Sequence, residues 1–569
     1  MACGHEATAT AAHEVLAAEG NAFDAAISAV ASACVAEPVL ASVGGGGYLL
    51  AQPQGASPRV YDFFVHTPKK KKPLADVEFF PLRADFGTTS QEFHIGAGSV
   101  ATPGLISGLF AVHRDLATLP MPELFAHSVQ YARTGVTVRE FDASVLRIVE
   151  DILRAMPECE ALFQSSRDAS QLLKTGEQYV NPELADVLES VSIEGEGLFY
   201  RGEIGARIAN LLNSGGHLER EDLESYETVD RAALAARYQG ADIGLNAAPA
   251  SGGVLTAFAL KLLEAMDFSH LEPGSCQALE VIAHALSITG HARSTAQEAG
   301  GVTPQMLTPK FMEPYLQVIS RHPLARSATT HISIIDGVGN VASVTLSNGE
   351  SAGLVVPGTG IVLNNMLGEE DLHPAGFHRW APNTRMTSMM TPTVVRKADG
   401  TCIATGSGGS NRIRSAILQT LVNLLTLKLD IEEAVERPKI HVEGRKLSVE
   451  HGIDSERIGP LLNTWPEHEL WDARSMFFGG AHTVLRDAHG GLRSAGDPRR
   501  SRRCLWHRRF PRLLVAFERP ARALPAGYAR GHRRAGRRRV AGRVGARRRL
   551  WHRSDRPCAG RSRDPQRPV

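Results

Sequence analysis

The sequence predicts a globular protein of mixed α and β structure. Of its 569 residues, 43% are hydrophobic and 22% are charged, and a chain of this length and composition can bury a large core. Helical patterns dominate the chain before Thr329, whereas polar and apolar residues alternate from Thr329 onward, as in a strand. The composition excludes a wholly disordered, collagen-like or disulfide-stapled protein.

The first helical segment, 11–36, is interrupted at Gly20 and Asn21 and is rich in alanine, which suits close packing against a neighbour. Four glycines, Gly44 to Gly47, then precede a short apolar strand. A phosphate-binding loop would need the pattern G-x-x-x-x-G-K-[ST], which is absent. The glycines therefore predict tight backbone packing or the wall of an active site.

Further helices are expected over 121–212, from Glu221, over 254–263 and over 276–290. The loop 246–253 leads into the third of these, and its Ser-Gly-Gly sequence is typical of a helix cap.

A strand, a glycine turn and a returning strand are predicted at 329–335, 336–340 and 341–345. Residues 337–342 match G-x-G-x-x-A, but they lie between two strands and do not open a helix, so a dinucleotide site is not indicated.

Turn-rich loops follow at 357–360, 385–392 and 405–412. The last precedes a helix expected over 413–427, which places its amides and the helix N-terminus to bind an anion or an oxyanion.

The overall charge of +1 hides a division of the chain. Residues 501–569 contain 22 arginines, no lysine and three acids, a net charge of +19, and the first 500 residues carry −18. A basic arm that binds nucleic acid or a membrane surface is one interpretation. Arginine without lysine favours the other, out-of-frame translation of a GC-rich gene, and therefore a disordered tail with no nucleic-acid partner.

The seven cysteines are an odd number, widely spaced, and form no C-x-x-C pair that would suggest zinc or a redox couple. They are interpreted as ordinary thiols, with a lone catalytic cysteine as the weaker alternative. The sequence as written predicts a cytoplasmic protein without a membrane span, because Met1 to Thr10 has no basic region followed by an apolar one. A periplasmic or secreted location follows instead if the chain begins downstream of a signal peptide.

Seven segments together resemble the gamma-glutamyltranspeptidase family of N-terminal nucleophile hydrolases, in the family's order and at similar spacings. The segments are Glu19 to Ala26, Gly44 to Gly47, Ala101 to Gly104, Pro249 to Gly253, Thr329 to Asp336, Pro357 to Asn365 and Gly406 to Ile413. A single glycine-rich match would be weak, but seven in register are specific.

The resemblance implies an α+β fold, a four-layer αββα sandwich formed jointly by a large segment, 1–328, and a small segment, 329–500. It also implies that the precursor cuts its own backbone between Ala328 and Thr329. A threonine hydroxyl is a poor nucleophile, but a freed α-amine has a pKa of roughly 7.7 to 8.0 and can act as its base. Without the resemblance, two threonines at a strand start would indicate only β-propensity.

The other roles follow from the resemblance. Ser347 corresponds to a hydroxyl that positions the nucleophile, and Asn348 to an amide that binds the substrate's α-carboxylate. Thr387 and Ser388 correspond to paired hydroxyls for the same carboxylate. Gly408 and Gly409 correspond to the glycines whose amides form the oxyanion hole. Taken singly, such hydroxyls and glycines are more typical of turns.

Two departures concern the substrate. Phe64 stands where family members have an arginine that clamps the glutamyl carboxylate, and a phenyl ring does not replace a guanidinium. The run Lys69 to Lys72 is near enough in sequence to supply a cation, although a solvated charged segment is the favoured interpretation. Glu369 keeps a carboxylate where the family binds the substrate's ammonium group.

The implied activity is that of a gamma-glutamyltransferase and glutathione hydrolase, acting through an acyl ester on Thr329 without metal or organic cofactor. Its partners would be a gamma-glutamyl compound such as glutathione, an amine or water as acceptor, and the two cleaved subunits for each other. The alternatives are an amide hydrolase of the same fold with different acyl specificity, similar to cephalosporin acylases or oxamate hydrolases, and an unprocessed pseudoenzyme whose tail binds nucleic acid.

Overall fold

The structure is a computed structural model that describes residues 1–569 except 86–89, 267, 318–328, 374–375, 502 and 505–569. The chain divides into two units, Met1–Arg508 and Arg509–Val569. Every element below belongs to the first unit. The arginine-rich tail from residue 505 lies outside the described residues, so the expectation of disorder there stays a prediction.

Two antiparallel sheets form the centre of this unit. The first sheet has seven strands in the order β22 (Arg503–Cys504), β1 (Ala2–Cys3), β11 (Thr330–Ile335), β12 (Val341–Ser347), β2 (Gly46–Gln52), β3 (Arg59–Phe63) and β8 (Val229–Ala232). The second has six in the order β21 (Leu492–Ala495), β20 (Ala481–Arg486), β16 (Cys402–Ser407), β15 (Thr393–Arg396), β10 (Ala241–Leu245) and β9 (Leu234–Tyr238). Both sheets combine strands from before and after Thr329.

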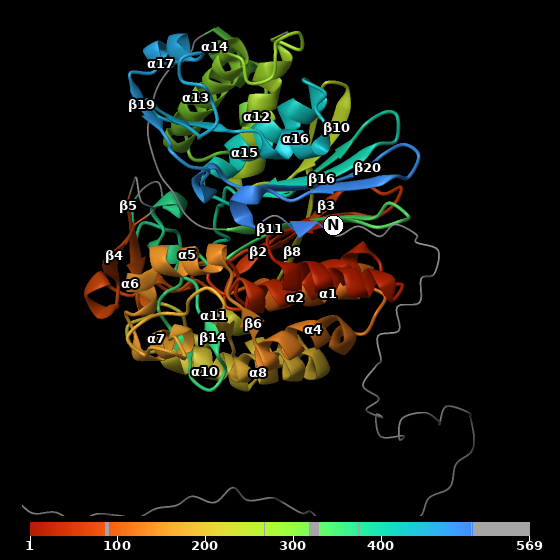
Figure 1. The fold of residues 1–569 in the computed structure, drawn as a ribbon. Coiled ribbons are helices and arrows are strands. Elements are labelled where there is room, and N and C mark those ends of the chain that lie inside the picture. The colour runs from red at the N-terminus through yellow and green to blue at the C-terminus, as the bar shows by residue number, and fades with distance from the viewer. Residues whose placement is uncertain (86–89, 267, 318–328, 374–375, 502, 505–569) are drawn as a thin grey trace, which may run out of the picture. The chain divides into compact units, whose positions relative to one another are not determined.

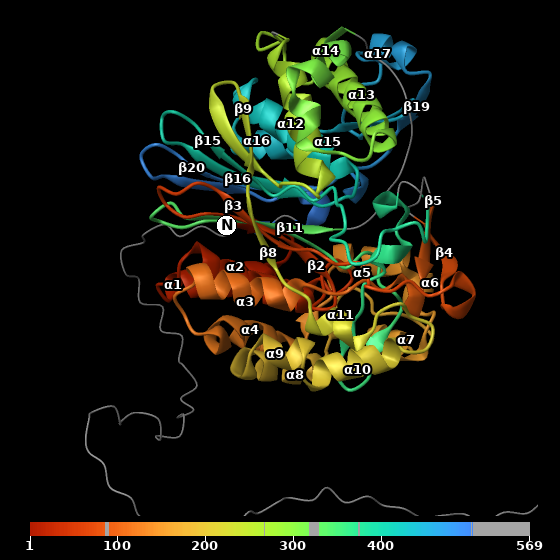
Figure 2. The ribbon, with the colours of Figure 1, turned by 180° about the vertical axis from the view of Figure 1, so that it is seen from behind.

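Helices cover the outer face of each sheet (Figures 1 and 2). On the first sheet lie α1 (Glu6–Ala17), α2 (Ala22–Ala36) and α3 (Leu105–Leu116), while α4 (Met121–Thr134) packs against α2 and α8 (Pro182–Glu194) packs against α4. On the second lie α12 (Ser251–Glu264), α15 (Arg412–Leu425) and α16 (Ile431–Glu436), while α13 (Cys276–Glu298) packs against α12. The predicted four-layer αββα sandwich, shared by the two segments, is confirmed.

Smaller elements surround these layers. The helices are α5 (Glu140–Ile148), α6 (Glu150–Leu153), α7 (Pro157–Phe163), α9 (Glu196–Tyr200), α10 (Glu203–Leu212), α11 (Arg220–Glu224), α14 (Pro309–Gln317) and α17 (Gly459–Thr464). The strands are β4 (Phe80–Asp85), β5 (Ser90–Ile95), β6 (Val136–Thr137), β7 (Gln178–Tyr179), β13 (Val355–Val356), β14 (Ile361–Val362), β17 (Ile440–Glu443), β18 (Lys446–Val449) and β19 (Glu467–Leu470).

The predicted break in the first helical segment separates α1 from α2. Asn21 caps α2, because its Oδ1 accepts hydrogen bonds from the amides of Phe23 at 2.7 Å and Asp24 at 3.0 Å. The cap predicted at Ser251 is wrong: Ala250 occupies the N-cap position of α12 and makes no side-chain cap. The Ser251 hydroxyl instead bonds that of Thr387.

The four glycines before β2 allow a close approach of backbones. A Cβ on Gly44 would lie 2.4 Å from the carbonyl oxygen of Val362, and a Cβ on Gly45 would lie 2.5 Å from that of Ser347. No other residue fits these positions without moving its neighbours. The prediction of tight packing is therefore confirmed.

The hairpin β11–β12 has the predicted turn, and the Asp336 carboxylate closes it. Its Oδ1 accepts bonds from the amides of Val338, Gly339 and Asn340, and its Oδ2 accepts one from the amide of Ala22. The hairpin is thereby tied to the start of α2.

The polar residues of this hairpin do not face water. Ser333 and Ser343 point toward the second sheet, where their hydroxyls donate to the carbonyls of His482 at 3.0 Å and Thr405 at 3.1 Å. The alternation predicted from sequence therefore separates an apolar helix-facing side from a polar layer between the two sheets.

The first sheet extends past the boundary expected at residue 500, since Cys504 of β22 pairs with Ala2.

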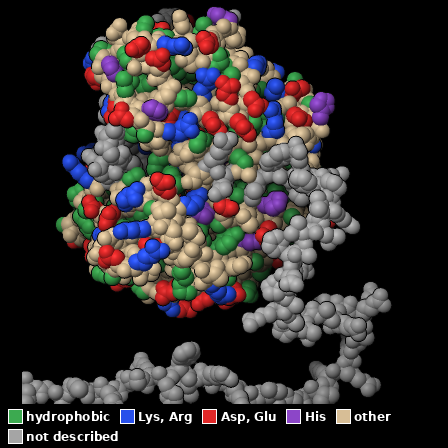
Figure 3. Space-filling view, viewed as in Figure 1, with side chains coloured by type: hydrophobic (Ala, Val, Ile, Leu, Met, Phe, Trp, Pro, Cys, Tyr) green, Lys and Arg blue, Asp and Glu red, His purple; other side chains and the backbone are tan. Residues whose placement is uncertain are grey.

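On the surface, acidic and basic side chains are interspersed over the face shown in Figure 3. None of the helices in the described ranges is both long and apolar enough to cross a bilayer.

Candidate active site

Thr329 lies directly before β11, with 4% of its surface exposed. It lines a narrow pocket with a cavity volume of about 20 Å³. The residues around the pocket are Phe64, Thr329, Ser347, Met366, Glu369, Asp371, Leu372, Ser388, Met389, Met390, Ser410 and Ile413. Ala328, the other side of the predicted cleavage site, lies outside the described residues.

The backbone around Thr329 is held by its surroundings. Its carbonyl oxygen accepts a hydrogen bond from Nη1 of Arg500 at 2.6 Å. Gly408 packs against the same carbonyl, since a Cβ there would lie 1.9 Å from the oxygen. The next residue, Thr330, donates its hydroxyl to Oε2 of Glu37 at 2.7 Å.

The structure brings Ser347 and Ser388 to the pocket of Thr329. Ser347 is the last residue of β12, and its Oγ accepts a bond from the amide of Gly349 at 3.1 Å. Ser388 Oγ accepts one from the amide of Met390 at 3.0 Å. Both residues line the pocket of Thr329, and their predicted roles toward a substrate stay predictions.

The side chains of Thr387 and Ser388 line different pockets. Its Oγ1 bonds the hydroxyl of Ser251 at 2.7 Å, and it lines a neighbouring pocket together with His373 and Trp380. Leu372 lines both pockets. The predicted pair of hydroxyls thus divides between two chambers, because successive residues of an extended segment point to opposite sides.

Asn348 is fully buried and does not line the pocket. Neither polar atom of its amide has a hydrogen-bond partner among the described residues, and Oδ1 lies beside Gly45. A buried amide without partners is costly. Its role in binding a carboxylate stays a prediction.

Gly408 and Gly409 precede α15, as expected from the sequence. Gly409 has φ of +114°, a conformation that favours glycine, and a Cβ there would lie 3.0 Å from Cα of Gly479. Amides at the N-terminus of a helix attract negative charge. This position suits the predicted oxyanion hole, which stays a prediction.

One wall of the pocket is apolar, formed by Phe64 and by the set Met366, Leu372, Met389, Met390 and Ile413. The described residues around the pocket include no lysine or arginine. Lys69 and Lys70 instead pair with Glu221 at 3.0 Å and Glu219 at 2.8 Å. The lysine run therefore serves as a charged surface segment.

Arg385 lies behind Phe64, where its guanidinium donates to the Phe64 carbonyl, to the Tyr226 hydroxyl and to the Glu227 carbonyl. These bonds hold the cation outside the pocket. The described residues thus supply no guanidinium clamp at this place.

Two carboxyl groups line the pocket, Glu369 as predicted and Asp371, which the sequence analysis missed. Asp371 accepts a hydrogen bond from Ser410. Burial raises the pKa of Asp371 to about 7, although the charges of Arg412 and Arg293 act to lower it. The signal for Asp371 was the run Gly-Glu-Glu-Asp, in which several acids could have faced the pocket.

Arg500 and Glu37 were also missed. Arg500 belongs to the Gly-Asp-Pro-Arg-Arg segment, but nothing in that segment reveals a contact with residue 329. Among the described residues, no cluster of three or more His, Cys, Asp or Glu side chains is arranged to hold a metal ion.

Comparison with known proteins gives a consistent result. The sequence profile of the gamma-glutamyltranspeptidase family matches residues 8–505. The glutathione hydrolase proenzyme of Escherichia coli (strain K12) is 27% identical over 535 residues, which cover 88% of this chain and 90% of that protein. The acylase ACY 1 proenzyme of Pseudomonas sp. (strain V22) is 28% identical over 470 residues, covering 79% and 83%.

Among solved structures, the cephalosporin acylase from Bacillus halodurans superposes with a TM-score of 0.77 at 21% identity. The match covers 89% of this chain and 95% of the acylase. At this identity the match supports the shared fold alone.

Proposed function

Since the chain belongs to the gamma-glutamyltranspeptidase family, an enzyme family, we propose that it is an autoprocessed gamma-glutamyl transferase and hydrolase. It would cleave gamma-glutamyl amides such as glutathione through an acyl ester on Thr329. The observation that carries the proposal is the position of Thr329, which is buried directly before β11 and lines a pocket with Ser347, Ser388 and Glu369.

The chemistry needs only groups of this chain. Once the bond before Thr329 is cut, the α-amine accepts the proton of the Thr329 hydroxyl as Oγ1 attacks the substrate carbonyl carbon. The amides of Gly408 and Gly409 stabilise the oxyanion. The C–N bond then breaks, and the leaving amine takes the proton from the α-amine. Water or an acceptor amine cleaves the ester and returns a proton to Oγ1.

The sheet order supports a cleaved enzyme that stays assembled. After cleavage, β11 and β12 would begin the small subunit, yet they lie between β1 and β2 of the large one. β11 pairs with β1, and β12 pairs with β2 from Val341 to Ser347. Backbone hydrogen bonds on both sides therefore join the two subunits.

The test is an intact-mass measurement with N-terminal sequencing of the purified chain, followed by activity on a gamma-glutamyl anilide and on glutathione. We expect two fragments, the smaller starting at Thr329, in the wild type and in the control Thr308→Ala, whose threonine is exposed. Thr329→Ala should stay uncut and inactive. An uncut wild-type chain would contradict the proposal and favour the pseudoenzyme.

A second candidate is an amide hydrolase with another acyl specificity. It is favoured by the apolar wall at Phe64 and by the pocket's lack of a cation among its described residues. An enzyme of this kind would be cleaved at the same bond, but it would prefer acyl groups without a carboxylate. Relative kcat/KM on gamma-glutamyl and apolar acyl anilides distinguishes the two.

A further inference from the structure

Two buried charged side chains from distant parts of the chain reach the peptide link between Thr329 and Thr330. Arg500, 2% exposed, follows β21 in the short helical turn Pro498–Arg500 and donates to the Thr329 carbonyl. Glu37, 4% exposed, ends α2 and accepts the hydroxyl of Thr330. Arg500 thus contacts the backbone carbonyl of Thr329, and Glu37 contacts the side chain of the next residue, Thr330.

The two groups also interact with each other. Burial raises the pKa of Glu37, while the hydrogen bond from Thr330 and, to a smaller extent, the charges of Arg139 and Arg500 act in the opposite direction. Burial lowers the pKa of Arg500 to about 10, which the charge of Glu37 counteracts. Burying two charges is costly unless they are paired and bonded, so their place beside Thr329 needs an explanation.

Neither group is fully used by the contacts described so far. Oε1 of Glu37 and Nη2 of Arg500 have no hydrogen-bond partner among the described residues. A buried polar atom without a partner calls for an explanation, and a catalytic role is one such explanation. The second bond of Arg500 goes from Nε to the carbonyl of Gly479 at 3.2 Å, which fixes the guanidinium in place.

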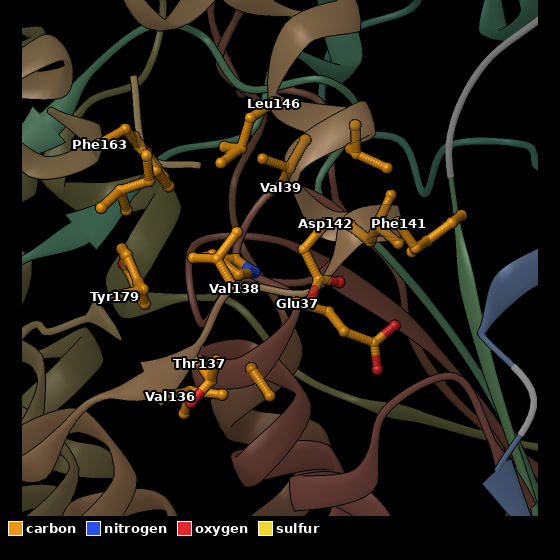
Figure 4. A pocket seen from close by; sticks show the side chains of 15 residues that line it. Glu37, Val39, Val136, Thr137, Val138, Phe141, Asp142, Leu146, Phe163 and Tyr179 are labelled. Atoms are coloured by element: carbon orange, nitrogen blue, oxygen red, sulfur yellow. The ribbon is translucent and has the colours of Figure 1, made fainter. Parts of the chain in front are cut away.

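Within the described ranges, the hydroxyl of Thr330 is the hydrogen-bond partner of the Glu37 carboxylate. Glu37 lines a pocket whose other side is apolar, and Figure 4 shows its carboxylate pointing away from Val138, Phe163 and Tyr179. The remaining titratable groups around it are Cys3 of β1, Cys34 of α2, and Arg139 and Asp142 at α5. Arg139 is occupied by a bidentate pair with Asp142.

Thr329 needs such support because it stands outside the strand. β11 begins at Thr330, which pairs with Leu346, so the residue before it lacks the ladder that fixes its neighbours. After cleavage it would also be a chain end, and chain ends are mobile unless they are tied down. A nucleophile that is also its own base must hold both groups in one geometry.

We propose that Glu37 and Arg500 are positioning residues that hold the Thr329–Thr330 link and so aim the Thr329 hydroxyl and α-amine into the pocket. The inference rests on the proposed function, because it assigns a task to a cleaved Thr329. It concerns the acyl-transfer step whatever the acyl group is.

The experiment compares Arg500→Ala, Arg500→Lys, Glu37→Ala and Thr330→Val with wild type, at equal amounts of titrated active sites. We expect kcat to fall about 10- to 100-fold in Arg500→Ala and Glu37→Ala, with little change in KM, because misplacing a reacting group affects the transition state more than binding. Thr330→Val should match Glu37→Ala, and the double variant should be no worse than either. The control Arg414→Ala removes another buried arginine, paired with Glu443, and should lower stability without lowering kcat.

A pH profile separates positioning from a merely structural role. A cation beside the α-amine disfavours its protonated form, so Arg500→Ala should shift the acid limb of kcat/KM to higher pH. Arg500→Lys keeps the positive charge, so its acid limb should lie at the wild-type pH. Its kcat should lie between that of Arg500→Ala and that of the wild type. Arg500→Ala that is folded by circular dichroism yet uncut also supports the proposal, because autocleavage uses the same hydroxyl. If Arg500→Ala fails to fold, the proposal is tested by the kcat of Arg500→Lys and by the acid limb of its kcat/KM profile.

The outcomes distinguish the two ideas. A wild type that is uncut or inactive overturns the proposed function. A wild type that is cut and active, with variants of unchanged kcat and unchanged acid limb, overturns the positioning role and leaves the proposed function standing.

Discussion

Phe64→Ala tests whether this ring shapes the acyl pocket. Phe64 is 1% exposed and stacks on Tyr48 with ring centroids 5.5 Å apart. Truncating such a buried ring lowers the free energy of unfolding by about 3–5 kcal/mol, of which the aromatic pair contributes about 0.5–1.5 kcal/mol. The same truncation enlarges the pocket beside Thr329.

The neighbouring Phe63 provides a matched control. It is 0% exposed but points to the opposite side of the sheet, where it packs against Gly108 of α3. Phe63→Ala should therefore destabilise the protein by a similar amount without changing the pocket. Comparing the two variants separates loss of stability from a change of specificity.

The assay measures kcat/KM for two anilides whose acyl chains differ by one methylene, together with urea unfolding of each variant. When an apolar pocket accepts one more methylene, the ratio of kcat/KM between the two substrates changes about 10- to 200-fold. We expect the ratio for longer over shorter chains to rise at least about 10-fold in Phe64→Ala and to stay unchanged in Phe63→Ala. Equal ratios in wild type and both variants would refute the assignment of Phe64 to the acyl pocket.

Three further predictions concern single residues. Gly408→Ala places a Cβ 1.9 Å from the Thr329 carbonyl oxygen and should lower kcat about 100- to 1000-fold, whereas Gly337→Ala, with open space around it, should keep full activity. Burial raises the pKa of Asp371 to about 7, so kcat/KM for amine-bearing over amine-free acyl substrates should rise as the pH increases through 7, and Asp371→Asn should abolish this rise. Burial alone would raise the pKa of Glu443, but Arg414 and His441 outweigh it and lower the value to about 2. Because the unfolded carboxyl binds a proton at a higher pH, near 4.5, this stabilisation is present above pH 4.5 and is lost as the pH falls toward 2. Glu443→Gln should flatten that part of a plot of Tm against pH, and the exposed Glu456→Gln should not.

The sequence by itself determined the elements whose signals are local. The alternation of polar and apolar residues and the glycine turn predict the hairpin around Asp336. A capping residue predicts the break at Gly20 and Asn21. Each of these signals lies within about ten residues of sequence. The fold class, and the prediction that Thr329 is the nucleophile, followed from motifs in a fixed order, which constrain the whole chain together.

The tertiary structure decided which side chains meet at the site. Thr330 and Glu37 are 293 residues apart, and Thr329 and Arg500 are 171 residues apart, so only the order of strands in the sheets brings them together. Asp371 lines the pocket of Thr329, whereas Thr387 lines the neighbouring pocket. The direction of a side chain in an irregular segment depends on the backbone around it, which the packing of distant elements sets and no local pattern records.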